Sequence, residues 1–316
     1  MSVSKCTRRA RVGFTLVELL VVIAIIAVLV SLTSAAVMKI AGKGPETQTR
    51  VEIGQLETGI AAARTELGLD YVPSYLVLRE DNAYDPNNAE HRATLSLLQK
   101  MFGRRIDLRP VTAGGPGIDW NGNGQIDSGV DLILEGQHCL VFFLGGIPSR
   151  PSASAGCLGF STDLVNPATP GGTRRGPYYE FKTNRLVRDP NNGFLIYRDA
   201  YDRQPYAYFS SRKSGNDYFT QYRPGSYRLR ADRAPGAGPG DCPSLYDVGL
   251  TLGAFNDGTQ FLKPRGFQIV SAGPDGAFGP GGTWNPSTGY PAGGATQAGQ
   301  DDMANFSAAQ LGNPQE

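Results

Sequence analysis

The hydrophobic positions near the start of the chain follow two successive patterns. Residues 14–38 are almost all apolar, and as a helix rising about 1.5 Å per residue they would be long enough to cross a bilayer. Within residues 53–67, apolar side chains recur at spacings of three and four, which places them on one helical face. We therefore expect a long N-terminal helix whose first part (14–38) is transmembrane and whose outer part (39–68) is amphipathic.

The outer part of this helix has a defined core face and defined ends. Its core face consists of Ile53, Leu56, Ile60, Ala63 and Leu67, whereas Glu52, Gln55 and Glu66 lie off that face. The two glycines and the proline of residues 39–45 predict a bend or local melting of the helix. Gly68 is placed to cap its C-terminus, and Glu46 and Arg50 are spaced for an i,i+4 ion pair.

The rest of the chain mixes short helical and strand patterns. Residues 89–102 predict a helix that buries Leu95, Leu98 and Phe102, and residues 131–144 predict a second, short one. Residues 193–197 and 205–209 are strand-like and are separated by turn residues. We therefore expect an α+β fold in which residues 69–316 form a globular domain, with a small antiparallel sheet, long loops and the N-terminal helix packed on the sheet.

A basic cluster and one carboxylate flank the start of the apolar stretch. Lys5, Arg8, Arg9 and Arg11 precede it, and the positive-inside rule keeps such a cluster in the cytoplasm and sends the rest of the chain outward. Glu18 lies within the stretch, where an unpaired carboxylate costs on the order of 2 to 3 kcal/mol. A partner for Glu18 is therefore expected. A signal peptide cleaved near the small residues 34–36 is the alternative.

The run Gly13-Phe14-Thr15-Leu16-Val17-Glu18 resembles the processing and methylation signal of type IV pilins and type II secretion pseudopilins. The resemblance implies that prepilin peptidase removes a leader of residues 1–13 by cutting after Gly13 and then methylates Phe14. It also implies that Glu18 pairs with the amino terminus of a neighbouring subunit in a homo-oligomeric filament. The implied location is the bacterial inner membrane, single-pass, with the C-terminal domain extracytoplasmic and an inner-membrane assembly platform as a further partner.

A loop in the middle of the chain has calcium-ligand spacing. Residues 119–127 read D-x-N-x-N-G-x-I-D, with oxygen-bearing side chains at alternate positions and a glycine at the sixth, as in the first half of an EF-hand loop. The candidate ligands are Asp119, Asn121, Asn123, the carbonyl of Gln125, Asp127 and Asp131, the last one residue beyond the usual twelfth position. A solvated Asn/Gly turn is the alternative.

The C-terminal region carries a second calcium-like pattern. Residues 267–279 and 300–306 resemble the calcium loop of the major pseudopilin of type II secretion, although the intervening residues 280–299 are longer than that pattern. The resemblance implies carboxylate ligands from Asp275, Asp301 and Asp302 and carbonyl ligands near Ser271 and Gly273. Calcium takes six to eight oxygens, which such a loop can supply. The alternative is that Asp301 and Asp302 cap a terminal helix or turn.

Composition narrows the function classes. The net charge of +1 argues against nucleic-acid binding, and the absence of nucleophile, P-loop and zincin motifs argues against an enzyme. Of the four cysteines, Cys157 and Cys242 are the expected disulfide, with buried free thiols as the alternative. We therefore expect a filament subunit that binds calcium. A membrane-anchored, calcium-binding adhesin or carbohydrate binder is the competing class.

Overall fold

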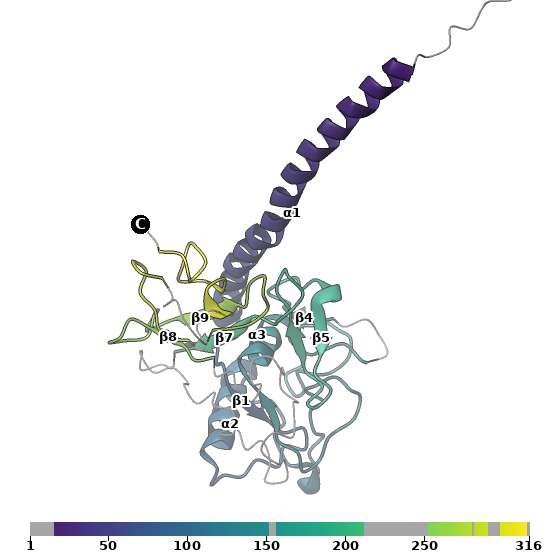
Figure 1. Cartoon of the computed structure of the whole chain (residues 1–316). Helices are drawn as coiled ribbons and strands as arrows, with labels where there is room; N and C mark the ends of the chain where they lie inside the picture. The colour runs from purple at the N-terminus through teal and green to yellow at the C-terminus, as the bar shows by residue number, and fades with distance from the viewer. Residues whose placement is uncertain (1–15, 152–155, 212–251, 280, 290–297, 315–316) are drawn as a thin grey trace, which may run out of the picture. The chain divides into compact units, whose positions relative to one another are not determined.

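The computed structural model describes residues 16–151, 156–211, 252–279, 281–289 and 298–314; within the first helix, the side chains of residues 32 and 34–42 are not described. The chain divides into two compact units, residues 1–45 and 46–316. The first unit contributes helix alone to the described structure, and the second contains all the strands (Figure 1). The α+β class expected from the sequence is confirmed.

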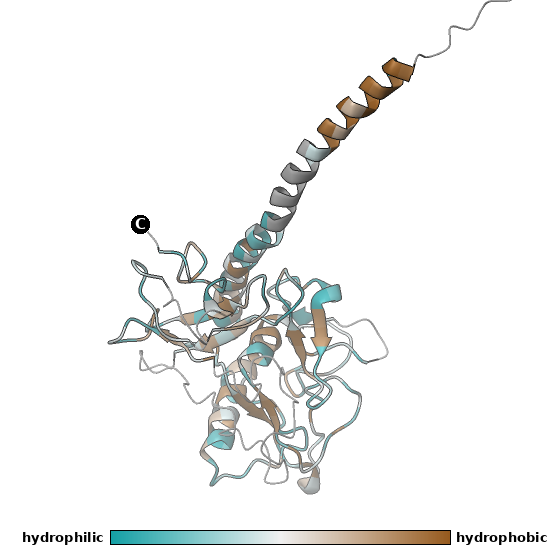
Figure 2. Ribbon diagram, in the orientation of Figure 1, coloured by the Kyte–Doolittle hydropathy of each residue, from teal (hydrophilic) through white to brown (hydrophobic). Residues whose placement is uncertain are grey.

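Helix α1 runs from Leu16 to Glu66 and is assigned as helix throughout, with Pro45 inside it. The local melting expected at residues 39–45 is therefore wrong, because the backbone keeps its helical assignment there. A single proline removes one backbone hydrogen bond, which the turns on either side can tolerate. Figure 2 shows that the first turns of the helix are mostly hydrophobic, and the described side chains from Leu16 to Ser31 are all exposed.

The part of α1 in the second unit buries the face that the spacing predicts. Its core-facing side chains and that of Leu67, directly after the helix, are at most 5% exposed; those in the helix are Ile53, Leu56, Ile60 and Ala63. Gly68 ends the helix with φ +65°, a left-handed conformation that glycine adopts without a steric cost. The Glu46–Arg50 ion pair is present, at 3.0 Å. Glu52, expected off the core face, is instead buried at 3% exposure.

The strands are short and form small sheets. Strands β7 (Ala207–Ser210), β9 (Phe267–Ser271) and β11 (Met303–Ala304) form an antiparallel sheet in the order β11-β9-β7. The antiparallel pairs are β1 (Leu76–Leu78) with β2 (Leu132–Leu134), β3 (Phe160–Ser161) with β4 (Arg174–Arg175), and β5 (Leu186–Arg188) with β6 (Leu195–Tyr197). The pair of β8 (Phe255–Asn256) with β10 (Gly282–Thr283) is parallel. The strands expected at residues 193–197 and 205–209 are present as β6 and β7.

Two further helices complete the core. Helix α2 covers Ala89–Phe102, as predicted, and buries Leu98 and Phe102, while Leu95 is only half-buried. Helix α3 covers Gly136–Gly145 and is buried along its whole length. The helix predicted for residues 131–144 is therefore wrong at its start, where Leu132–Leu134 pairs as β2 with β1. Short 3-10 turns lie at Val111–Ala113 (η1) and Thr183–Arg185 (η2).

Helix α1 enters this core directly beside α3. A Cβ atom added at Gly59 would lie 3.1 Å from Leu144 of α3 and 3.2 Å from the carbonyl oxygen of Tyr178. The core side chains of α1 share one hydrophobic cluster with Phe142, Tyr208 and Ile269. The outer part of α1 is therefore a core element of the globular unit.

Candidate functional site

The predicted processing site begins just before the described residues. Gly13 and Phe14 lie outside them, and Glu18 lies in the first turn of α1 with its side chain exposed. Its neighbours Leu16, Val17 and Leu19 are 58–78% exposed. Among residues whose side chains the structure describes, no helix combines the length and apolar character needed to cross a membrane.

The three C-terminal aspartates approach one another through backbone contacts. The backbone N–H of Asp275 donates to Oδ2 of Asp301 at 2.9 Å, and that of Gly279 donates to Oδ2 of Asp302 at 3.0 Å. These bonds join the two halves of the loop (residues 271–279 and 300–302, here called the acid loop) across the long intervening segment. The sequence therefore identified two segments that are in contact.

Asp302 is the unusual member of the acid loop. Its side chain is fully buried, and its Oδ1 atom has no hydrogen-bond partner among the described residues. Burial raises the pKa of Asp302 well above its usual value, and the charges of Asp301 and Asp275 add to this effect. Burial also raises the pKa of Asp301, with Asp275 contributing.

An orphaned carboxylate oxygen beside two further carboxylates has the chemistry of a cation site, because a buried acceptor without a partner is costly. Carboxylate oxygens are the donor type that a hard cation such as calcium prefers, and calcium binding by the acid loop stays a prediction. In the part of the chain that the structure describes, no three His, Cys, Asp or Glu side chains gather closely enough to count as a metal-binding group.

Ser271 and Gly273 have structural tasks in this loop. The Ser271 hydroxyl donates to Oδ2 of Asp199 at 2.6 Å, so its side chain is turned toward a residue that sequence reasoning missed. Burial raises the pKa of Asp199 to about 6, although the Ser271 bond opposes the rise. Gly273 has φ +66°, and a Cβ there would lie 2.2 Å from the Asp301 carbonyl oxygen. Only glycine permits this approach of the two halves.

The middle loop also brings its predicted ligands together. The side-chain amides of Asn121 and Asn123 lie 3.2 and 3.1 Å from Oδ2 of Asp127. Asp119 accepts the backbone N–H groups of Asn123 and Gly124 at 3.0 and 2.8 Å. Gln125 donates its backbone N–H to Oδ1 of Asn123 at 2.7 Å. Calcium binding by this loop stays a prediction.

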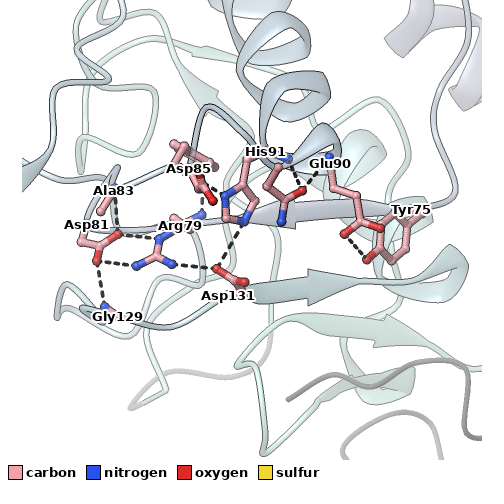
Figure 3. A network of polar contacts seen from close by, with 11 residues as sticks. Tyr75, Arg79, Asp81, Ala83, Asp85, Glu90, His91, Gly129 and Asp131 are labelled. Carbon is pink, nitrogen blue, oxygen red and sulfur yellow. Dashed lines mark hydrogen bonds and ion pairs between the residues drawn. The ribbon is translucent and has the colours of Figure 1, made fainter. Parts of the chain in front are cut away.

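Two residues that follow β1, Arg79 and Asp81, contact the segment at the end of the middle loop, at Asp131 and Gly129 (Figure 3). Arg79 forms an ion pair with Asp131 at 2.9 Å and a two-point contact with Asp81 at 3.0 and 3.1 Å. Asp81 in turn accepts the backbone N–H of Gly129 at 2.7 Å. Burial would raise the pKa of Asp81, but the hydrogen bonds from Arg79, Gly129 and Ala83 outweigh it and lower the pKa to about 2.

Asp131, a predicted calcium ligand, is part of this network. Its Oδ1 atom binds Arg79 and lies 3.5 Å from Nε2 of the buried His91, whose Nδ1 accepts the backbone N–H of Asp85 at 2.9 Å. In this structure Asp131 therefore contacts Arg79 and His91.

Glu80 is the carboxylate that sequence reasoning missed here. It is fully buried, and its two oxygens accept the backbone N–H groups of Asn121 at 3.1 Å and Asp127 at 2.9 Å. Burial raises its pKa to about 7, and the charges of Asp119 and Asp127 contribute. The available signal was a charged tripeptide, residues 79–81, directly after an apolar run.

The predicted disulfide lies partly outside the described residues, which exclude Cys242. Burial raises the pKa of the Cys157 thiol to about 12. Cys157 is a free cysteine in this structure, and its pairing with Cys242 stays a prediction.

Comparison with known proteins identifies the amino-terminal segment. Residues 8–34 match the family model described as the prokaryotic N-terminal methylation motif. No characterised protein and no solved structure gives a significant match. The matched residues include the Gly13–Glu18 run and the first turns of α1. The chain thus carries, at residues 8–34, the signal of type IV pilins and pseudopilins.

Proposed function

We propose that this protein is a structural subunit of a type II secretion or type IV pilus-like filament. The observation that carries the proposal is the methylation motif at residues 8–34. It continues into a helix whose described apolar side chains, up to Val30, are exposed. Exposed apolar area of this extent is favourable only when lipid or other helices cover it. The motif points to a structural subunit rather than an enzyme.

The proposed assembly step uses two charges near one end of this helix. Cutting after Gly13 removes the basic leader and creates an amine at Phe14. Glu18 of one subunit then pairs with the amine of its neighbour. In a bundle of apolar helices the low dielectric strengthens this attraction, and leaving either charge unpaired is costly. The pair therefore favours one axial register between subunits.

Before assembly, residues 14–38 are proposed to insert in the bacterial inner membrane, with the globular unit on the extracytoplasmic side. The basic cluster before Gly13 supports this orientation. The proposed partners are prepilin peptidase, further pilin subunits and an inner-membrane assembly platform.

The acid loop is proposed to hold calcium. Asp275, Asp301 and Asp302 would supply carboxylate oxygens, and the buried Oδ1 of Asp302 supports this assignment. A bound divalent cation would neutralise the acid cluster and fix the two halves of the loop. The calcium ion is proposed in a structural role.

Glu18→Ala tests the filament role. We expect normal cleavage after Gly13, seen as an amino-terminal peptide of the processed mass, together with loss of filaments sedimented from cells that express the partner pilins. Glu66→Ala, at an exposed acid in the last turn of the same helix, is the matched control and should assemble normally. Normal assembly of Glu18→Ala would contradict the proposal and favour a tethered surface protein.

A further inference from the structure

Asn305 follows strand β11 and ties it to β9. Its backbone N–H donates to the carbonyl oxygen of Ile269 at 3.1 Å. Its side chain spans the same strand, because Nδ2 donates to the carbonyl oxygen of Phe267 and Oδ1 accepts the N–H of Ile269, both at 3.1 Å. One residue thus makes three contacts with two positions of β9.

Helix α1 holds the same side chain from the other direction. Oε1 of Glu57 accepts Nδ2 of Asn305 at 2.8 Å and also binds Nζ of Lys263 at 3.0 Å. The Glu57 side chain is 35% exposed, so its contacts are partly shielded from water. The orientation of the Asn305 amide is therefore determined by α1 and β9 together.

The pairing that Asn305 secures decides which aspartate is buried. In the observed register Met303 lies opposite Ser271 and Ala304 lies opposite Val270. Asp302, directly before the strand, is buried, whereas Asp301 is partly exposed. Because side chains alternate along a strand, a slip of one residue exchanges the two faces. It would turn the Asp302 carboxylate out of the acid loop.

We propose that Glu57 is a positioning residue for the acid loop, acting through Asn305 to fix the register of β11 and thereby the placement of Asp302. The inference rests on the calcium site proposed above and extends it to a residue of α1. It also means that helix α1 and the acid loop are energetically linked, and such linkage is reciprocal.

The test compares Ca²⁺ binding by the natural full chain with binding by its variants. Binding is measured in detergent micelles by titration calorimetry. The binding heat that is lost in Asp302→Asn is the part that comes from the acid loop. Glu57→Ala and Asn305→Ala are expected to weaken this binding roughly tenfold or more, as is usual when the supports of metal ligands are lost. Glu57→Gln keeps an oxygen acceptor for Asn305 and should bind nearly as tightly as the natural chain. Glu66→Ala is the control.

The outcomes separate the two proposals. If the natural chain and Asp302→Asn give the same calcium heat, the calcium site itself is wrong, and the positioning role falls with it. If the natural chain binds at Asp302 and Glu57→Ala binds equally tightly, only the positioning role is overturned. A lower metal-free melting temperature with an unchanged calcium affinity likewise overturns it, because that result describes a purely structural contact.

Discussion

The carboxylate of Glu52 and the guanidinium of Arg185 form an ion pair inside the globular unit, where their side chains are only 3% and 5% exposed. The same carboxylate accepts Nε2 of Gln48 at 2.9 Å, Nζ of Lys182 at 3.0 Å and the hydroxyl of Tyr206 at 2.9 Å. The Arg185 guanidinium also lies over the Tyr197 ring, 4.7 Å from its centroid. Helix α1 is thus attached to the domain by a satisfied buried charge as well as by apolar packing.

Glu52→Gln is expected to destabilise the domain by about 3 to 5 kcal/mol, since it leaves the Arg185 charge buried without its partner. Chemical denaturation of the full chain in detergent measures the difference. Gln55→Ala, at an exposed position of the same helix, is the control and should change stability by about 0.5 kcal/mol or less. A loss below about 1 kcal/mol for Glu52→Gln would show that the pair contributes little.

The same pair predicts a pH dependence. Burial alone would raise the pKa of Glu52, but its bonds to Arg185, Gln48 and Lys182 outweigh burial and lower it from 4.5. The folded state therefore favours the charged form, and this stability is present above pH 4.5 and is lost as the pH falls through the lowered pKa. The stability difference between the natural chain and Glu52→Gln should narrow below pH 4.5. A difference that stays constant from pH 7 to pH 3 would contradict this reading.

Calcium removal is expected to lower the melting temperature of the globular unit. Saturation at about 100 times the dissociation constant stabilises a folded protein by roughly 2.7 kcal/mol. Asp302→Asn should abolish the part of the calcium-induced shift that comes from the acid loop. The variant should not lower the metal-free melting temperature. It removes a buried acid whose Oδ1 atom has no hydrogen-bond partner among the described residues. No shift on chelation would count against both calcium loops.

The middle loop can be tested separately in the Asp302→Asn chain. If residues 119–127 bind calcium, Asp127→Ala should remove the remaining calcium-induced shift, because Asp127 is the carboxylate on which the two asparagine amides converge. Asp163→Ala is the matched control, since Asp163 accepts the backbone N–H of Val165 at 2.8 Å in an exposed turn of another loop. Equal calcium-induced shifts in both variants would assign residues 119–127 to a solvated turn.

The sequence predicted well those features that depend on local periodicity. The buried face of α1 from Ile53 to Ala63 and the bounds of α2 follow from a 3.6-residue repeat. Strand β2 was mistaken for helix because three residues are too few to show a period of two. Its identity depends on pairing with Leu76–Leu78, more than 50 residues earlier.

Charged residues were harder to place from the sequence. Glu52 follows the helical repeat of a surface position, and its burial depends on Arg185, which comes from a different part of the chain. Glu80 and Asp199 were missed for the same reason, since each is buried against backbone groups or a hydroxyl of a distant segment. The two halves of the acid loop were predicted from their resemblance to the calcium loop of the major pseudopilin, but the contact of Ser271 with Asp199 could not be derived from spacing.

The support of the middle loop by Arg79, Glu80 and Asp81 has a consequence for ligand binding. These side chains fix Asp131, the backbone N–H groups of Asn121 and Asp127, and that of Gly129. The conformational entropy of the loop is thus lost when the domain folds, before any ligand arrives. A preorganised loop binds without a further ordering cost, so calcium binding there would leave the backbone amide exchange of residues 119–131 almost unchanged.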